Sequence, residues 1–240
     1  MGDFMSSFKK VIISLIVLIL IGTGTFFGTK FFLIKKLEDK YSSSEYKLAS
    51  IELKKIELAP IQVKEGKHTI IEDSNIKFTI PLENGKISNS SSGSIKVDFD
   101  DKKMVAYMGA SDTYSDELTK DLKPSEEKKV KEYFGTELLS SEYEFFKTIY
   151  GCKPSELSLT SSFNKIAAYN GGLLVKSMML PGFAKGIYYF ETDDIKGFMC
   201  IGDTNISLDF YSDDSTRYSI LLSNLTEEDA KQIISSVEFK

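Results

Sequence analysis

An apolar run near the N-terminus constrains this chain more than any other feature of its 240 residues. Residues 11–34 read VIISLIVLILIGTGTFFGTKFFLI, and their only charge is Lys30. The uncharged part, from Val11 to Thr29, has 19 residues. At about 1.5 Å per residue it would extend about 29 Å as a helix, close to the ~30 Å hydrocarbon core of a bilayer. We therefore predict a transmembrane helix over residues 11–34, with the lipid bilayer as its partner, after a short tail of residues 1–10.

A cleaved secretory signal is the alternative interpretation of this run. The apolar core of a signal peptide usually has about 7–15 residues and is followed by a small-x-small cleavage site. The present run is longer, and the sequence after Thr29 is Lys-Phe-Phe-Leu-Ile-Lys-Lys, without an Ala-x-Ala pattern. The length favours a retained anchor, so we expect a single-pass protein of the cell membrane.

The flanking lysines and the N-terminal position of the run indicate opposite orientations of the chain in the membrane. Lys9 and Lys10 precede the uncharged part of the run, and four lysines follow it: Lys30, Lys35, Lys36 and Lys40. The plain count favours a cytoplasmic C-terminal domain under the positive-inside rule. An N-terminal anchor with two lysines at the membrane edge instead resembles an uncleaved signal, whose lysines resist translocation. We expect the C-terminal domain to be extracytoplasmic.

Composition limits the possibilities for the rest of the chain. With 42% hydrophobic and 12% aromatic residues the chain has enough apolar side chains for a core, although it has no Trp. We expect a charged stalk over residues 35–66 and one globular domain over residues 67–240. The net charge is −5, and the lysines are scattered among 35 acidic residues. Nucleic acid is therefore excluded as a partner, because binding phosphates requires a clustered positive face. Arg217 is the only Arg, which is typical of a low-GC bacterial genome.

Hydrophobic periodicity in the C-terminal part predicts an α+β fold, an antiparallel sheet packed with helices. Apolar and polar residues alternate, as in strands, over residues 76–81, 94–99, 103–108, 186–192, 195–202, 205–211 and 217–223. Helical patterns begin at Ser125, Ser141, Ser162 and Thr226, and Gly135, Gly151 and Pro181-Gly182 end the first three. Short Asp-containing turns join the last four strands, which makes them antiparallel neighbours.

Three segments carry a resemblance to a known family. They are Ile76–Pro81, the strand Gly186-Ile-Tyr-Tyr-Phe-Glu-Thr192, and residues 225–239 with their Thr-Glu-Glu-Asp helix start. With the order of elements, they resemble the PsbP/Mog1-like α/β/α sandwich, as in membrane-anchored or lipoprotein-like proteins of low-GC Gram-positive bacteria. The resemblance implies a binding or accessory module rather than an enzyme.

Few residues offer catalytic or metal-binding chemistry. His68 is the only His, and the two cysteines are Cys152 and Cys200. A nucleophilic Cys–His pair would need the fold to bring His68 beside one of them. A zinc site needs three or four ligands, more than these residues supply. The cysteines either pair or remain buried, inert thiols, and the core-strand pattern around Cys200 favours inert thiols. We assign no catalytic, cofactor-binding or metal-binding residue.

Two further features have a functional and a structural interpretation. Acidic groups recur at Asp98/Asp100/Asp101, Asp193/Asp194 and Asp213/Asp214, where they either form turns or bind a cation weakly. Gly171-Gly172 either opens a ligand cleft beside Tyr169 and Asn170 or lets its helix pack closely. In both cases we favour the structural interpretation.

The sequence therefore predicts a non-enzymatic binding or accessory module, anchored at the cell surface, with an unknown protein partner. Two alternatives remain. One is a small thiol- or His-dependent enzyme, motivated by His68 and the two cysteines. The other is a structural subunit of a membrane complex, supported by the small-residue spacing Gly24-x-x-x-Gly28 within the apolar run.

Overall fold

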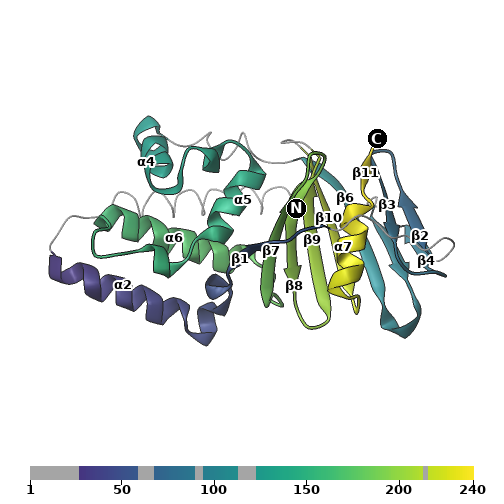
Figure 1. Ribbon diagram of the computed structural model, residues 1–240, viewed down its shortest axis with the longest axis horizontal. Helices are drawn as coiled ribbons and strands as arrows, with labels where there is room; N and C mark the ends of the chain where they lie inside the picture. Colours follow the sequence, from purple (N-terminus) through teal and green to yellow (C-terminus); the bar gives the residue numbers. More distant parts are fainter. Residues whose placement is uncertain (1–26, 59–67, 90–93, 113–122, 213–215) are drawn as a thin grey trace. The chain divides into compact units, whose positions relative to one another are not determined.

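The computed structural model describes residues 27–58, 68–89, 94–112, 123–212 and 216–240. These residues belong to two compact units (Figure 1). The helical unit comprises Met1–Glu52 and Tyr114–Leu180, and the sheet unit comprises Leu53–Thr113 and Pro181–Lys240. The helical unit is therefore assembled from two stretches of chain, and its second stretch interrupts the sequence of the sheet unit.

Four α-helices form the described part of the helical unit: α2 (Phe27–Tyr41), α4 (Pro124–Phe134), α5 (Glu142–Gly151) and α6 (Phe163–Met179). Short 3-10 turns lie between them: η1 (Ser44–Ser50), η3 (Glu137–Leu139) and η4 (Pro154–Glu156). The Ser141 hydroxyl accepts a hydrogen bond from the Glu144 backbone N–H, and the Ser162 hydroxyl accepts one from Lys165. These N-caps satisfy N–H groups that lack partners in the first turn of α5 and of α6.

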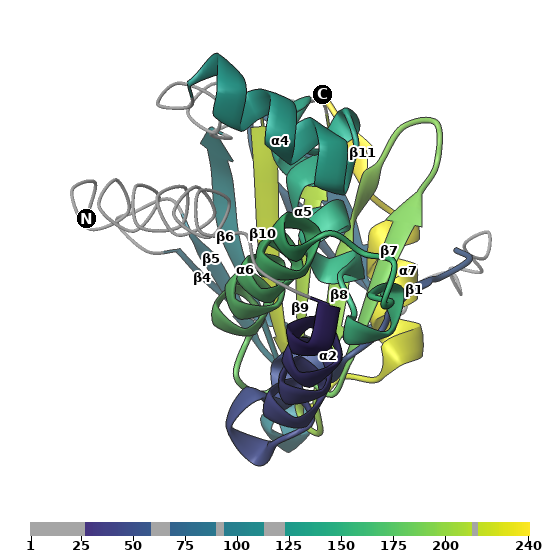
Figure 2. The ribbon, with the colours of Figure 1, turned by 90° about the vertical axis from the view of Figure 1, so that its left-hand side faces the viewer.

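A hydrophobic core of the helical unit lies where α2 packs on α6 (Figure 2). From α2 it takes residues at positions i, i+3 and i+7, the spacing of one helical face. Its buried members are Ile34, Leu37, Tyr41, Ala49, Cys152, Leu157, Ile166, Tyr169 and Leu173. The Tyr41 hydroxyl lies 2.8 Å from Asn170 Oδ1 and 2.9 Å from the Asn170 carbonyl oxygen, which ties the end of α2 to α6.

The sheet unit contains an eight-stranded sheet in the order β1-β7-β8-β9-β10-β6-β5-β4. Its strands are β1 (Leu53–Lys55), β4 (Lys86–Asn89), β5 (Ile95–Asp98), β6 (Met104–Asp112), β7 (Gly186–Glu191), β8 (Lys196–Ile201), β9 (Asn205–Tyr211) and β10 (Thr216–Ser223). Every pair is antiparallel except β1 with β7, which is parallel. A second, antiparallel sheet has the order β11-β3-β2, from β2 (Thr69–Glu72), β3 (Ile76–Ile80) and β11 (Glu238–Phe239).

Helix α7 (Glu227–Ser235) completes the core of the sheet unit and contacts β3 and β9. Alternate residues of the strands point into this core, as the period of a half-buried strand requires. Its members include Ile76, Phe78, Ile80, Ile206, Leu208, Phe210, Tyr218, Ile220, Leu222, Ala230, Ile233 and Ile234. A capping box between Thr226 and Asp229 begins α7, as its sequence predicted.

The α+β class is confirmed, and so are the four strands of the last third and the four helices that the patterns predicted. The large sheet is mixed rather than antiparallel, because β1 pairs in parallel with β7. The sequence patterns did not predict β2, β4 or β11. Of these, β4 carries one apolar residue, Ile87, and an exposed strand of that kind gives no alternating signal.

The division of the chain differs from the predicted stalk over residues 35–66 and single domain over 67–240. Residues 35–50 form the rest of α2 and η1 and bury Leu37, Tyr41 and Ala49 in the helical unit. Strand β1 joins the sheet, and residues 59–66 of the predicted stalk lie outside the described residues. The predicted domain itself contributes to both units.

The predicted tail, residues 1–10, and most of the predicted transmembrane helix, residues 11–26, lie outside the described residues. Residues 27–34, the rest of that prediction, form the first turns of α2. Among the helices that the structure describes, none combines the length and apolar character needed to span a bilayer.

Candidate functional site

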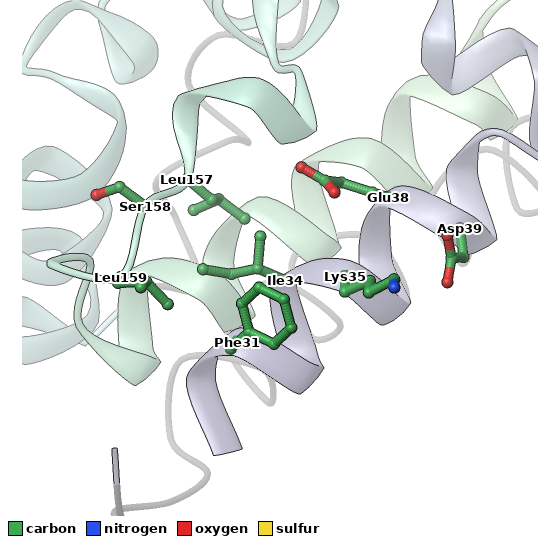
Figure 3. A pocket seen from close by; sticks show the side chains of 8 residues that line it. All are labelled: Phe31, Ile34, Lys35, Glu38, Asp39, Leu157, Ser158 and Leu159. Atoms are coloured by element: carbon green, nitrogen blue, oxygen red, sulfur yellow. The ribbon is translucent and has the colours of Figure 1, made fainter. Parts of the chain in front are cut away.

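An open pocket of about 420 Å³ lies in the helical unit, between α2 and the segment that follows η4 (Figure 3). Its size falls in the ~300–1,000 Å³ range of ligand sites. It is lined by Phe31, Ile34, Lys35, Glu38, Asp39, Leu157, Ser158 and Leu159. Helix α2 supplies five of these residues, which share one side of the helix because they lie at i, i+3, i+4, i+7 and i+8, and the other three are consecutive.

The two ends of this pocket differ in chemistry. Phe31, Ile34, Leu157 and Leu159 gather where α2 begins, and the charged side chains lie further along the helix (Figure 3). The charged end carries one cation, Lys35, and two carboxylates, Glu38 and Asp39. An apolar end beside a net negative end favours a ligand with an apolar group and a cationic group.

A second arrangement in the helical unit centres on Lys176, a lysine of α6 that is 1% exposed. Its Nζ donates a hydrogen bond to the Cys152 carbonyl oxygen at 3.0 Å. Burial lowers the pKa of this amine from 10.5 to about 8, although the Cys152 thiol and the Glu156 and Glu52 carboxylates oppose that shift. Lys176 is thus a buried cation that one carbonyl oxygen and nearby acids stabilise.

The thiol of Cys152 lies next to this lysine and is buried. It donates to the Thr148 carbonyl oxygen at 3.4 Å, and burial raises its pKa from 9.0 to about 12. A Cβ on Gly172 would lie 3.0 Å from Cys152 Sγ, so the absence of a side chain there makes room for the thiol. The structure therefore supports close packing, rather than a ligand cleft, as the reason for Gly172.

Tyr169 and Glu156 form the edge of the same arrangement. The Tyr169 hydroxyl donates to Glu156 Oε2 at 2.7 Å, and its ring stacks on Phe134 with centroids 5.6 Å apart. Burial and the bond to Glu156 raise the pKa of this phenol. The charge of Glu156 acts on the pKa values of Tyr169, Cys152 and Lys176, and none of these four residues lines the open pocket.

A separate polar group lies in the sheet unit, on β8, β9 and β10. Cys200 is a free, buried thiol opposite Ser207, and burial raises its pKa to about 12. Asp209 lies opposite Ser219, whose hydroxyl donates to Asp209 Oδ1 at 2.5 Å. Burial raises the pKa of Asp209, while the bond from Ser219 and the charge of Arg217 act in the opposite direction.

The residues proposed from sequence as catalytic candidates are divided between the two units. Cys152 belongs to the helical unit, whereas Cys200 and His68 belong to the sheet unit. His68 is half-buried just before β2, in a different sheet from Cys200, and its Nδ1 is buried without a hydrogen-bond partner among the described residues. The prediction of two buried, unpaired thiols is confirmed.

Most residues of the acidic groups lie in turns where the structure describes them, whereas Asp98 ends strand β5. Thr192 Oγ1 accepts hydrogen bonds from the backbone N–H groups of Asp194 and Ile195, which folds the turn between β7 and β8. Asp100 and Asp101 lie in η2 (Asp100–Lys102), the turn between β5 and β6. Asp213 and Asp214 lie outside the described residues. Within the part of the chain that the structure describes, no three His, Cys, Asp or Glu side chains group as metal ligands would.

No protein-family model, curated protein or solved structure matches this chain.

The sequence patterns predicted neither the pocket nor Lys176. A signal for Lys176 was present, because it lies three residues after Leu173 and seven after Tyr169, on the buried face of α6. Leu157 and Leu159 were also visible as apolar residues in a Ser-rich segment, but their position beside α2 depends on a long-range contact.

Proposed function

We propose that this protein is a membrane-anchored, non-enzymatic binding or accessory module, and that the pocket beside α2 is its binding site. The observation that carries this proposal is the pocket itself, which joins an apolar end to a net negative end. The proposal includes an anchor formed by the apolar run of residues 11–34, whose last residues begin α2, and an extracytoplasmic position for both units.

The chemistry of the buried groups supports binding over catalysis. The thiolate is the nucleophilic form of cysteine, and a pKa near 12 keeps Cys152 and Cys200 protonated at neutral pH. The amine of Lys176 is also directed at the Cys152 carbonyl oxygen rather than at solvent. A thiol- or lysine-dependent enzyme would need such groups in an open cleft.

The proposed ligand is a segment of a partner protein that presents an apolar side chain followed by a basic one. The apolar side chain would occupy the end formed by Phe31, Leu157 and Leu159, and the basic one would face Glu38 and Asp39. Because one lysine and two carboxylates line the pocket, a basic side chain gains more from this site than an acidic one.

Titration of short peptides against the full chain in nanodiscs tests the proposed site. The probes are acetylated tetrapeptides that contain one Leu and one Lys, and matched peptides in which Glu replaces Lys. We expect the Leu–Lys peptides to shift amide signals of α2 and residues 157–159, and the Leu–Glu peptides to bind at least tenfold more weakly. L159D should abolish binding by placing a charge at the apolar end.

A matched control is available on α6. Met178 is exposed to a similar degree as Leu159, 46% against 56%, but does not line the pocket. M178D should therefore bind the Leu–Lys peptides as the natural chain does. Equal binding of both peptide classes, or equal losses in L159D and M178D, would refute the assignment of the site.

A further inference from the structure

Exposed apolar side chains in the helical unit concentrate where α2 begins. Four large apolar residues of this unit are exposed in the part of it that the structure describes: Phe31 (62%), Phe32 (64%), Leu159 (56%) and Met178 (46%). Phe31 and Leu159 line the same pocket, and Phe32 follows Phe31 on α2. Met178 lies near the other end of α6, so three of the four belong to one end of the unit.

Packing within the helical unit determines which residues of the apolar run can contact lipid. Ile34 and Leu37 are buried among side chains from α6 and the segment after η4, and Leu33 packs against the same core. These residues cannot also face hydrocarbon. The uncharged part of the run ends at Thr29, five residues before Ile34. Lys30, Phe31 and Phe32 therefore lie at the transition between the uncharged run and the part of α2 that packs in the protein core.

The charged residues of α2 nearest that transition are cations. Lys30, Lys35 and Lys36 come first, Glu38 and Asp39 follow, and Lys40 lies in the last turn. Lys30 Nζ lies 5.4 Å from the centre of the Phe163 ring at the start of α6, so this cation stays at the same end of the unit. Aromatic residues beside lysines are typical of helices at the lipid–water interface, where the rings enter the acyl boundary and the amines meet phosphates.

We propose that Lys30, Phe32 and Lys36, at this end of the helical unit, dock on the surface of an anionic bilayer, while Phe31 and Leu159 beside them line the pocket. The hydrocarbon boundary then lies at Thr29–Lys30, five residues before the predicted end of the transmembrane helix at Ile34. The lysines meet anionic headgroups, and Glu38 and Asp39 lie farther from the membrane. This inference rests on the anchor in the proposed function, and it adds a contact between the folded unit and the lipid surface.

The absence of Trp from the sequence gives this proposal a direct spectroscopic test. F32W places a single indole at the proposed contact, and M178W places one at the other end of α6. Both full-length variants are reconstituted into vesicles of phosphatidylcholine alone or with phosphatidylglycerol. Lipids brominated near the headgroup or near the acyl terminus serve as quenchers, and carbonate extraction records whether the chain is anchored.

We expect F32W to emit at a shorter wavelength than M178W and to be quenched at least twofold more strongly by the shallow bromines. Phosphatidylglycerol should strengthen that quenching, and K36E in the F32W background should remove the dependence on phosphatidylglycerol. Because the Phe32 side chain is 64% exposed, F32W should fold as the natural chain does, which its thermal unfolding midpoint checks.

Two results would overturn the docking. In one, F32W remains accessible to aqueous acrylamide and is not quenched by brominated lipid; in the other, M178W is quenched equally. Either result with a chain that resists carbonate extraction would leave the anchor intact. A chain that carbonate extracts would remove the anchor and the docking together.

Discussion

Burial lowers the pKa of Lys176, and this shift makes the stability of the folded chain depend on pH. Its pKa is about 8 in the folded chain and 10.5 ordinarily, so between these values the unfolded chain binds more protons. The free energy of unfolding therefore rises with pH from about pH 8. Cys152 and Cys200 have the opposite sign, because the pKa of each thiol is raised from 9.0 to about 12 and the folded chain retains both protons. We expect the rise to be confined to about pH 8–9.

Denaturant unfolding of the full chain between pH 7 and 10 measures this dependence. K176M replaces the buried cation by an apolar side chain of similar length, which should leave the chain at pH 7 unchanged or up to about 3 kcal/mol more stable. K176M should also lack the rise above pH 8, whereas C152A should keep the stability level above pH 9, because the raised pKa of Cys200 still offsets that of Lys176 there. A natural chain whose stability does not change between pH 8 and 9 would show that Lys176 titrates normally.

Gly172 allows a packing test with a control glycine at the end of a neighbouring helix. Alanine usually stabilises a helix by about 1 kcal/mol relative to glycine. At Gly151 a new Cβ would meet nothing within 4 Å, whereas at Gly172 it would lie 3.0 Å from Cys152 Sγ. We expect G172A to be less stable than G151A by about 1 kcal/mol in thermal or denaturant unfolding. Adding C152A to both variants should reduce this difference, and an unchanged difference would contradict the proposed contact.

The buried thiols could be predicted from sequence, but the sites around them could not. The apolar residues beside Cys200 on its strand indicated burial, and both cysteines are indeed buried. Lys176 escaped prediction because a helical pattern identifies the apolar residues of a buried face, whereas α6 buries a broader face that includes Ala168, Gly171 and Lys176.

Helix α2 is the element for which sequence and structure differ most. Its second half, from Lys35 to Tyr41, is rich in charge and reads as a stalk, yet Leu37 and Tyr41 are buried. The signal is the spacing of Ile34, Leu37 and Tyr41 on one helical face, which the intervening charges obscure. The predicted strands of the last third were easier, because short turns between alternating segments determine antiparallel neighbours locally.

The packing of α2 predicts different costs for two truncations on opposite faces. L37A removes a buried side chain and should lower the free energy of unfolding by about 2–4 kcal/mol. F32A removes an exposed one and should change it by less than about 0.5 kcal/mol. Hydrogen exchange of the α2 amides should accelerate in L37A alone. Equal stability of the two variants in denaturant unfolding would restore the stalk interpretation.

At the scale of the whole molecule, each unit is built from segments that are distant in sequence. The pocket joins α2 to residues 157–159, and the large sheet joins β1 to β7 and β6 to β10. Composition and periodicity describe neighbours along the chain, so they predicted most elements but neither the division into two units nor the pocket. The parallel pairing of Leu53 with Ile187 is a contact of this kind.

The position of β10 has a consequence for the order in which the sheet can form. Although β10 comes last in sequence among the eight strands, it lies in the interior, between β9 and β6. Until β10 is synthesised, the sheet consists of two separate ribbons, β1-β7-β8-β9 and β6-β5-β4, each with an open edge on β9 or β6. Unpaired strand edges are templates for association between chains. A nascent or truncated chain that ends before Thr216 would therefore expose both edges at once, and a single late strand would close them.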